Sequence, residues 1–229
     1  MLRLIVFDLD GTLIDSRQDL AHATNRLLAE SGAAPLPDDD IVAMVGEGAA
    51  VLVRRALSAA ALDVDPSAAL ARFLEIYDSC LLDSTRAYPG IEDALAGLDG
   101  TVGLAVLTNK PERATRRILE GLRLLRFFGD AVLGADSRFP RKPDPAALLH
   151  LAARAGASPD TTLMVGDSRV DLETARRAGT AICLAKYGFG YRFDAADLTG
   201  AEHVVEEPAA LVPLVRRLAG GGPEGEARG

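Results

Sequence analysis

Hydrophobic and polar positions divide this chain into two kinds of segment. Five short apolar runs are predicted as buried strands, because most of them are too short or too rich in β-branched residues to favour helix; they are residues 2–7, 102–107, 131–133, 162–165 and 181–184. Between the later runs lie helical patterns that open with proline or aspartate and end near glycine; they cover residues 111–120, 145–155 and 171–178. This alternation predicts a parallel sheet covered by helices on both faces.

Residues 16–86 break the alternation, because they contain no convincing strand. Their pattern predicts four helices, at residues 18–30, 41–45, 49–61 and 66–83. We therefore expect an α/β fold with a Rossmann-like core of residues 1–15 and 87–218, and an all-helical subdomain of residues 16–86 above the sheet. The glycine-rich polar tail, residues 219–229, is predicted to be flexible.

Composition and charge narrow the classes of function. Hydrophobic residues make up 48% of the 229 residues and the formal net charge is −8, so we expect a soluble globular protein without the basic patch that nucleic acid requires. No apolar stretch reaches the roughly 18 residues of a membrane span. Two distant cysteines, Cys80 and Cys183, suggest buried thiols in a reducing compartment. With no signal-peptide pattern at the N-terminus, a cytoplasmic location is expected.

The first apolar run ends in two carboxylates, in the stretch VFDLDGTLIDS at residues 6–16. Ligands bind at the carboxyl ends of parallel strands, and alternation along the chain turns Asp8 and Asp10 toward the same cavity. Adjacent carboxylates stay ionised together only near a cation; otherwise one takes a proton. One of them could attack phosphorus as a nucleophile while the other acts as a general acid and base.

Three later motifs follow predicted strands or a loop between them. In VLTNKP, Thr108 and Asn109 could hydrogen-bond a phosphoryl group, although both residue types also cap helices. Lys142 in RKPDP offers a point charge for a phosphate or a carboxylate, or is a solvated surface lysine. Asp167 and Asp171 in MVGDSRVD provide the hard oxygen ligands that suit Mg²⁺, while Asp171 also fits the first turn of a helix.

The motifs DLDGTLID, TNK, KPDP and GDSRVD, in this order, resemble the haloacid dehalogenase superfamily of phosphotransferases over roughly residues 1–218. The resemblance implies that Asp8 is the nucleophile and Asp10 the general acid and base. A second aspartate at position 10 is similar to the phosphatase and mutase branch, whereas the dehalogenases lack it. The inserted helices then correspond to the cap that closes over such sites.

The same resemblance implies roles for the remaining motif residues. Thr108 and Asn109 would hold the phosphoryl group, with Lys142 beside them. Mg²⁺ would be bound by Asp8, by Asp167 and by the backbone carbonyl of Asp10, with Asp171 supporting the metal site.

The cap segment MVGEGAAVLVRRAL, residues 44–57, is similar to the Gly-x-Gly loop and following helix of the phosphoglycolate phosphatases. The expected reaction is therefore hydrolysis of a small phosphorylated metabolite, 2-phosphoglycolate. Backbone amides of Gly46, Glu47 and Gly48 would approach the leaving group, and Arg54 or its neighbour Arg55 would meet a second anion.

Several alternatives stay open at this point. A sugar phosphate, a nucleotide or pyrophosphate could be the substrate, or the enzyme could be a phosphomutase. A binding protein without catalysis is disfavoured, since a binder needs no acid and base at position 10. No nucleic acid or membrane partner is expected, and the chain is predicted to be a monomer or a homodimer.

Overall fold

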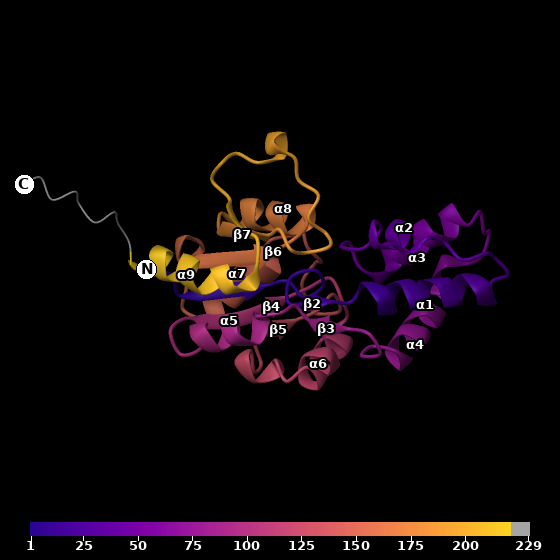
Figure 1. Cartoon of the computed structure of the whole chain (residues 1–229), viewed down its shortest axis with the longest axis horizontal. Helices are drawn as coiled ribbons and strands as arrows, with labels where there is room; N and C mark the ends of the chain where they lie inside the picture. Colours follow the sequence, from indigo (N-terminus) through magenta and orange to yellow (C-terminus); the bar gives the residue numbers. More distant parts are fainter. Residues whose placement is uncertain (221–229) are drawn as a thin grey trace, which may run out of the picture.

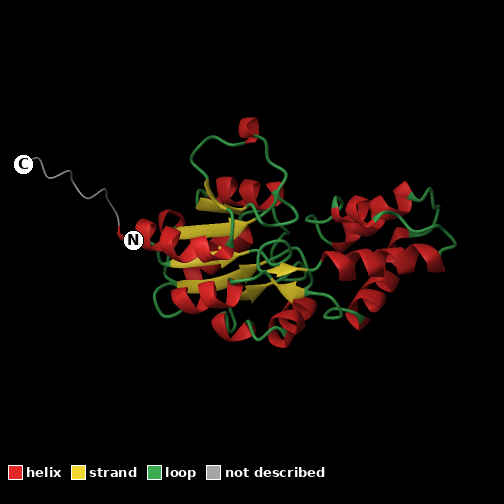
Figure 2. Ribbon diagram, viewed as in Figure 1, coloured by secondary structure: helices red, strands yellow, loops and turns green. Residues whose placement is uncertain are grey.

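Six parallel strands form the central sheet of the computed structural model, which describes residues 1–220. They lie in the order β5-β4-β1-β6-β7-β8, with β1 between β4 and β6 in the middle. Figure 2 shows the strands side by side in the core, with helices around them. Their bounds are β1 Leu4–Phe7, β4 Gly103–Leu107, β5 Val132–Leu133, β6 Thr162–Gly166, β7 Ala181–Ala185 and β8 His203–Val205. The first five are the predicted strands. The sixth, β8, was not predicted, because this short edge strand carries one polar residue and buries only Val205.

Helices cover both faces of the sheet, as the alternation predicted. The side chains of Ile5 and Phe7 pack toward α5, α6 and α9, whereas those of Leu4 and Val6 pack toward α7 and α8. The bounds are α5 Ile91–Leu98, α6 Glu112–Gly121, α7 Ala146–Arg154, α8 Arg169–Ala178 and α9 Leu211–Gly220. Helices α5 and α9 were not among the predicted helices. The α/β fold with a parallel sheet is confirmed.

Four helices form a separate group at one end of the sheet (Figure 1). They are α1 Arg17–Glu30, α2 Asp38–Val42, α3 Ala49–Ala59 and α4 Pro66–Ser79. Helix α2 begins at Asp38 rather than at Ile41, because its three aspartates favour the positive end of the helix dipole. We call this group the cap; its exact boundaries, residues 16 and 86, stay a prediction.

The cap enters and leaves the core through a short antiparallel pair, β2 Ile14–Asp15 and β3 Arg86–Ala87. The predicted flexible tail, residues 219–229, lies outside the described residues except for its first two, which end α9. Within residues 1–220, no helix has the length and apolar character needed to span a membrane. Cys80 and Cys183 are buried free thiols, as predicted.

Candidate active site

The two aspartates follow the central strand of the sheet. The backbone N–H of Asp8 donates to the carbonyl of Val165 at 2.9 Å, which extends the pairing of β1 with β6 by one residue. Gly11 then turns the chain with a φ of +81°, and a Cβ at this position would lie 1.8 Å from Asp167 Oδ2. Only glycine fits so close to a buried carboxylate. Asp8 and Asp10 line the same cavity, as the alternation predicted.

Lys142 is buried between two carboxylates and is not a surface lysine. Its Nζ lies 2.9 Å from Asp8 Oδ1 and donates to Asp171 Oδ1 at 2.6 Å, and its side chain is 1% exposed. Burial acts to lower the pKa of Lys142, but the negative charges of Asp171 and Asp8 outweigh it and raise that pKa. The ammonium therefore stays charged beneath Asp8.

Asp167 and Asp171 come from the end of β6 and the first turn of α8. Asp171 Oδ2 accepts from Ser168 N at 3.1 Å and Ser168 Oγ accepts from Asp171 N at 3.3 Å, and these two bonds form a capping box at the start of the helix. Asp171 Oδ2 also accepts from Ser168 Oγ at 2.6 Å. Its other oxygen faces Lys142. Asp171 is thus both a first-turn residue of the helix and a member of the buried carboxylate cluster. The two predicted placements of this residue are therefore compatible.

Three carboxylates form a potential metal centre. Ligand atoms of Asp8, Asp167 and Asp171 lie within 4.8 Å of one another, and all three residues are buried. Burial first, and then the charge of Asp171, raise the pKa of Asp8 to about 7; the same causes raise the pKa of Asp167 well above its usual value. Within residues 1–220, Asp8 Oδ1 receives no well-aligned hydrogen bond, although Lys142 Nζ lies 2.9 Å away. Surplus negative charge on hard oxygen donors fits a divalent cation.

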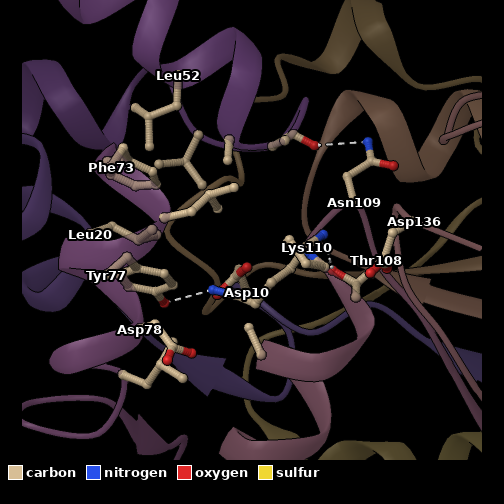
Figure 3. A pocket seen from close by; sticks show the side chains of 18 of the residues that line it. Asp10, Leu20, Leu52, Phe73, Tyr77, Asp78, Thr108, Asn109, Lys110 and Asp136 are labelled. Carbon is tan, nitrogen blue, oxygen red and sulfur yellow. Dashed lines mark hydrogen bonds and ion pairs between the residues drawn. The ribbon is translucent and has the colours of Figure 1, made fainter. Parts of the chain in front are cut away.

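The carboxylate of Asp10 has different neighbours. Asp10 Oδ1 accepts from Ser16 Oγ at 2.5 Å and from Lys110 Nζ at 2.9 Å. Lys110 Nζ also donates to the hydroxyl of Tyr77 at 2.7 Å, and Tyr77 lies on the cap helix α4 (Figure 3). Sequence analysis missed Lys110 and Tyr77. Lys110 is the lysine of the TNK motif, but the neighbouring sequence does not predict that its side chain is buried. That the backbone carbonyl of Asp10 binds the metal stays a prediction.

Thr108 and Asn109 follow β4 and line the cavity, as predicted. Asn109 Nδ2 donates to the carbonyl of Gly46 at 3.2 Å and to that of Lys142 at 3.1 Å. Its amide group therefore connects the cap loop to the core, and its buried Oδ1 has no hydrogen-bond partner among the described residues. Contact of Thr108 and Asn109 with a phosphoryl group stays a prediction.

The predicted cap residues separate into two groups. Gly46 and Gly48 line the cavity, and Gly48, with a φ of +91°, leaves only 3.0 Å between a Cβ and the carbonyl oxygen of Asn109. Glu47 pairs with Arg55 at the surface, and Arg54 is exposed on α3; neither lines the cavity. The structure thus brings the two glycines to the site but not these two side chains.

A cavity of about 420 Å³ lies between the cap and the core. Its floor is polar and includes the carboxylates of Asp8, Asp10 and Asp167. The cap contributes an apolar wall, and Figure 3 shows Leu20, Leu52, Phe73 and Tyr77 on the side opposite Thr108 and Asn109; further apolar lining residues are Val45, Ala49 and Leu74. The carboxylates of the floor and the apolar wall therefore come from different parts of the chain.

The parallel sheet, the buried carboxylates at its carboxyl edge and the enclosing cap helices together define a Rossmann-like α/β protein with a candidate metal-dependent active site. Residues 5–185 match the model of the haloacid dehalogenase-like hydrolase family, and the chain belongs to that family.

Relatives with known names fit this assignment. The chain is 41% identical over 217 residues to a phosphoglycolate phosphatase of Pseudomonas putida, which covers 92% of this chain and 79% of the relative. It is 42% identical to a phosphoglycolate phosphatase of Rhodospirillum rubrum, and this match covers 92% of this chain and 90% of that relative. A crystal structure of a predicted phosphoglycolate phosphatase from Haemophilus somnus superposes with a TM-score of 0.86 at 29% identity. The superposition covers 93% of this chain and 98% of that chain.

Proposed function

We propose that this enzyme is a Mg²⁺-dependent phosphatase that hydrolyses 2-phosphoglycolate to glycolate and phosphate. The observation that supports the chemistry is the convergence of Asp8, Lys142, Asp167 and Asp171 at the floor of a cavity that Asp10 also lines. The relatives that share about 40% identity over most of the chain support the choice of substrate.

In the first step, a carboxylate oxygen of Asp8 attacks phosphorus. A bond between phosphorus and Asp8 forms, the bond from phosphorus to the ester oxygen breaks, and Asp10 gives its proton to that oxygen. Lys142, held against Asp8 and Asp171, offsets the negative charge that accumulates beside the carboxylate. The product of this step is an aspartyl-phosphate and free glycolate.

In the second step, Asp10 acts as a base. It takes a proton from a water molecule as that water attacks phosphorus, and the bond between phosphorus and Asp8 breaks. Phosphate leaves and both aspartates return to their starting states. Thr108 and Asn109 would hold the phosphoryl oxygens from the end of β4 in both steps.

Mg²⁺ would be held by Asp8 and Asp167, with Asp171 and the backbone carbonyl of Asp10 in support. When bound, it neutralises part of the charge of the carboxylates and of the phosphate dianion, which otherwise repel each other.

The carboxylate of the substrate needs a partner in a cavity whose cap wall is apolar. Gly46 and Gly48 bring backbone amides to the wall, and Arg54 was the predicted second contact. In the described part of the chain, Arg113 is the cation that lines the cavity without an ion pair, whereas Lys110 pairs with Asp10. Arg113 therefore joins Arg54 as a candidate for the second anion.

A substrate panel assayed by phosphate release tests the proposal. We expect kcat/KM for 2-phosphoglycolate to exceed that for hexose phosphates, nucleotides and pyrophosphate by about tenfold or more, each factor of ten being worth about 1.4 kcal/mol. Conversion of a hexose 1-phosphate to a 6-phosphate would instead identify a mutase. Asp8→Asn should remove turnover while the fold survives.

Two matched variants, Arg54→Gln and Arg113→Gln, identify the anion contact. The one that meets the carboxylate should raise KM for 2-phosphoglycolate but not for ethyl phosphate, which lacks the second charge. A panel that ranks another ester first would contradict the substrate, and a fully active Asp8→Asn enzyme would contradict the mechanism.

A further inference from the structure

The ammonium of Lys110 connects the cap to the carboxylate of Asp10. The Lys110 side chain is 5% exposed, and its Nζ lies 2.9 Å from Asp10 Oδ1 in the core and 2.7 Å from the Tyr77 hydroxyl on α4. The same nitrogen lies 4.5 Å from the centroid of the Tyr77 ring. A buried ammonium with two oxygen partners is held in one position, because leaving either partner would expose it to an apolar wall.

This contact also determines which oxygen of Asp10 is available. Lys110 and Ser16 both donate to Oδ1, at 2.9 and 2.5 Å. Oδ2 accepts no hydrogen bond from the described residues 1–220, and Asp10 lines the cavity. Two donors on one oxygen fix the rotation of the carboxylate, so Oδ2 is presented to a substrate in a constant direction.

Tyr77 is itself fixed within the cap. It is 4% exposed, and its ring stacks on Phe73 with centroids 5.8 Å apart. Two further contacts bridge the cap and the same core segment, residues 109–117: Asn109 donates to Gly46, and Arg117 pairs with Asp78 of α4. These contacts therefore couple the position of α4 to the position of the loop that carries Lys110.

We propose that Tyr77 is a positioning residue of the reaction: from the cap it holds Lys110 against Asp10, so that Asp10 is oriented for proton transfer only while α4 is seated over the core. The proposal rests on the proposed role of Asp10 as acid and base. The orientation of the Asp10 carboxylate would then depend on the position of the cap. Tyr77 takes no part in bond making or breaking.

The test is a double-mutant cycle of Tyr77→Phe and Lys110→Met, measured in single turnovers so that phosphoryl transfer itself is observed. Tyr77→Phe should slow transfer from 2-phosphoglycolate about tenfold, the effect of one hydrogen bond to a charged group. The loss should be small for an aryl phosphate, whose leaving group needs little protonation, and KM should change little. Lys110→Met should slow transfer more.

The decisive result is the double variant. If Tyr77 acts through Lys110, Tyr77→Phe has no further effect in the Lys110→Met background. Independent, additive losses, an equal loss for the aryl and alkyl esters, or a raised KM with an unchanged rate would each overturn the proposal. If Lys110→Met fails to fold in a thermal unfolding assay, Lys110→Gln takes its place in the cycle.

Two controls complete the design. Tyr191→Phe removes a hydroxyl that makes no hydrogen bond within the described residues, from a ring that packs on Phe193 with centroids 5.1 Å apart outside the cavity, and should leave both rates unchanged. Asp10→Asn should slow the alkyl ester much more than the aryl ester. If Asp10→Asn does so and Tyr77→Phe does not, only the positioning role fails; if Asp10→Asn does not, the acid and base role fails, and the positioning role with it.

Discussion

At the scale of single residues, the unusual feature is the environment of Asp8. Its carboxylate is buried beside Asp171 and Asp167, and Lys142 compensates only part of the negative charge. This arrangement destabilises the ionised form in the metal-free protein, which raises the pKa of Asp8 from 3.8 to about 7. The proposed nucleophile is therefore only partly ionised near neutral pH until a cation joins the cluster.

This raised pKa predicts how the stability of the metal-free protein depends on pH. Between pH of about 4 and 7 the folded state holds a proton on Asp8 that the unfolded state has lost, so the free energy of unfolding falls as pH rises through this window. In Asp8→Asn that contribution is absent. Urea unfolding in EDTA at pH 5 and at pH 7.5 should show the variant gaining stability relative to wild type at the higher pH. If wild type and Asp8→Asn differed in free energy of unfolding by the same amount at both pH values, the raised pKa of Asp8 would be contradicted.

At the scale of elements, the connection between cap and core depends on a buried carboxylate. Asp19, in the first turn of α1, accepts from the backbone N–H groups of Ser84 and Thr85 and from the hydroxyl of Thr85, at 2.7–3.1 Å. It thereby ties the entry helix of the cap to the two residues that precede β3, beside the β2–β3 pair. Without Asp19 the buried donors of Thr85 lose this partner, whereas the N–H of Ser84 is only partly buried.

We expect Asp19→Ala to lower the free energy of unfolding by roughly 2–4 kcal/mol, since it leaves the buried backbone N–H and hydroxyl of Thr85 without this acceptor. Asp63→Ala, at an exposed position of the cap, is the matched control and should change stability by less than about 0.5 kcal/mol. Urea unfolding of the three proteins measures both values. Equal stabilities of the two variants would show that the tie contributes nothing.

At the scale of the whole molecule, a metal ion would join segments that are far apart in the sequence. Its candidate ligands come from the ends of β1 and β6 and from the start of α8. Because this set exists only in the folded chain, Mg²⁺ should stabilise the fold, by about 2.7 kcal/mol at a concentration one hundred times its Kd.

EDTA should abolish activity and Mg²⁺ should restore it, together with a rise in Tm. Ca²⁺ should raise Tm but inhibit, because its larger and looser coordination holds Asp8 in the wrong geometry. Thermal unfolding and phosphate release measured on the same samples check this prediction. An enzyme that keeps its full activity in EDTA would refute the metal role.

The sequence by itself determined the core and the positions of its functional groups along the chain. Five apolar runs became five of the six strands of the sheet, and Asp8, Thr108 and Asp167 follow the strands they were predicted to follow. These predictions succeed because strand and helix periodicities are local and because parallel strands end at one edge of a sheet. Strand β8 was missed because an edge strand of three residues has almost no periodicity.

Only the tertiary structure decided which side chains meet. Lys110 and Tyr77 lie 33 positions apart, and Asn109 and Gly46 lie 63 apart, yet each pair bonds across the boundary of the cap. The outward direction of Arg54 was equally hidden, because the rotation of α3 about its axis is set by which of its residues pack on α4. A local sequence pattern predicts whether a segment forms a helix or a strand. The partners of a buried polar group lie in other segments of the chain, so a local pattern does not predict them.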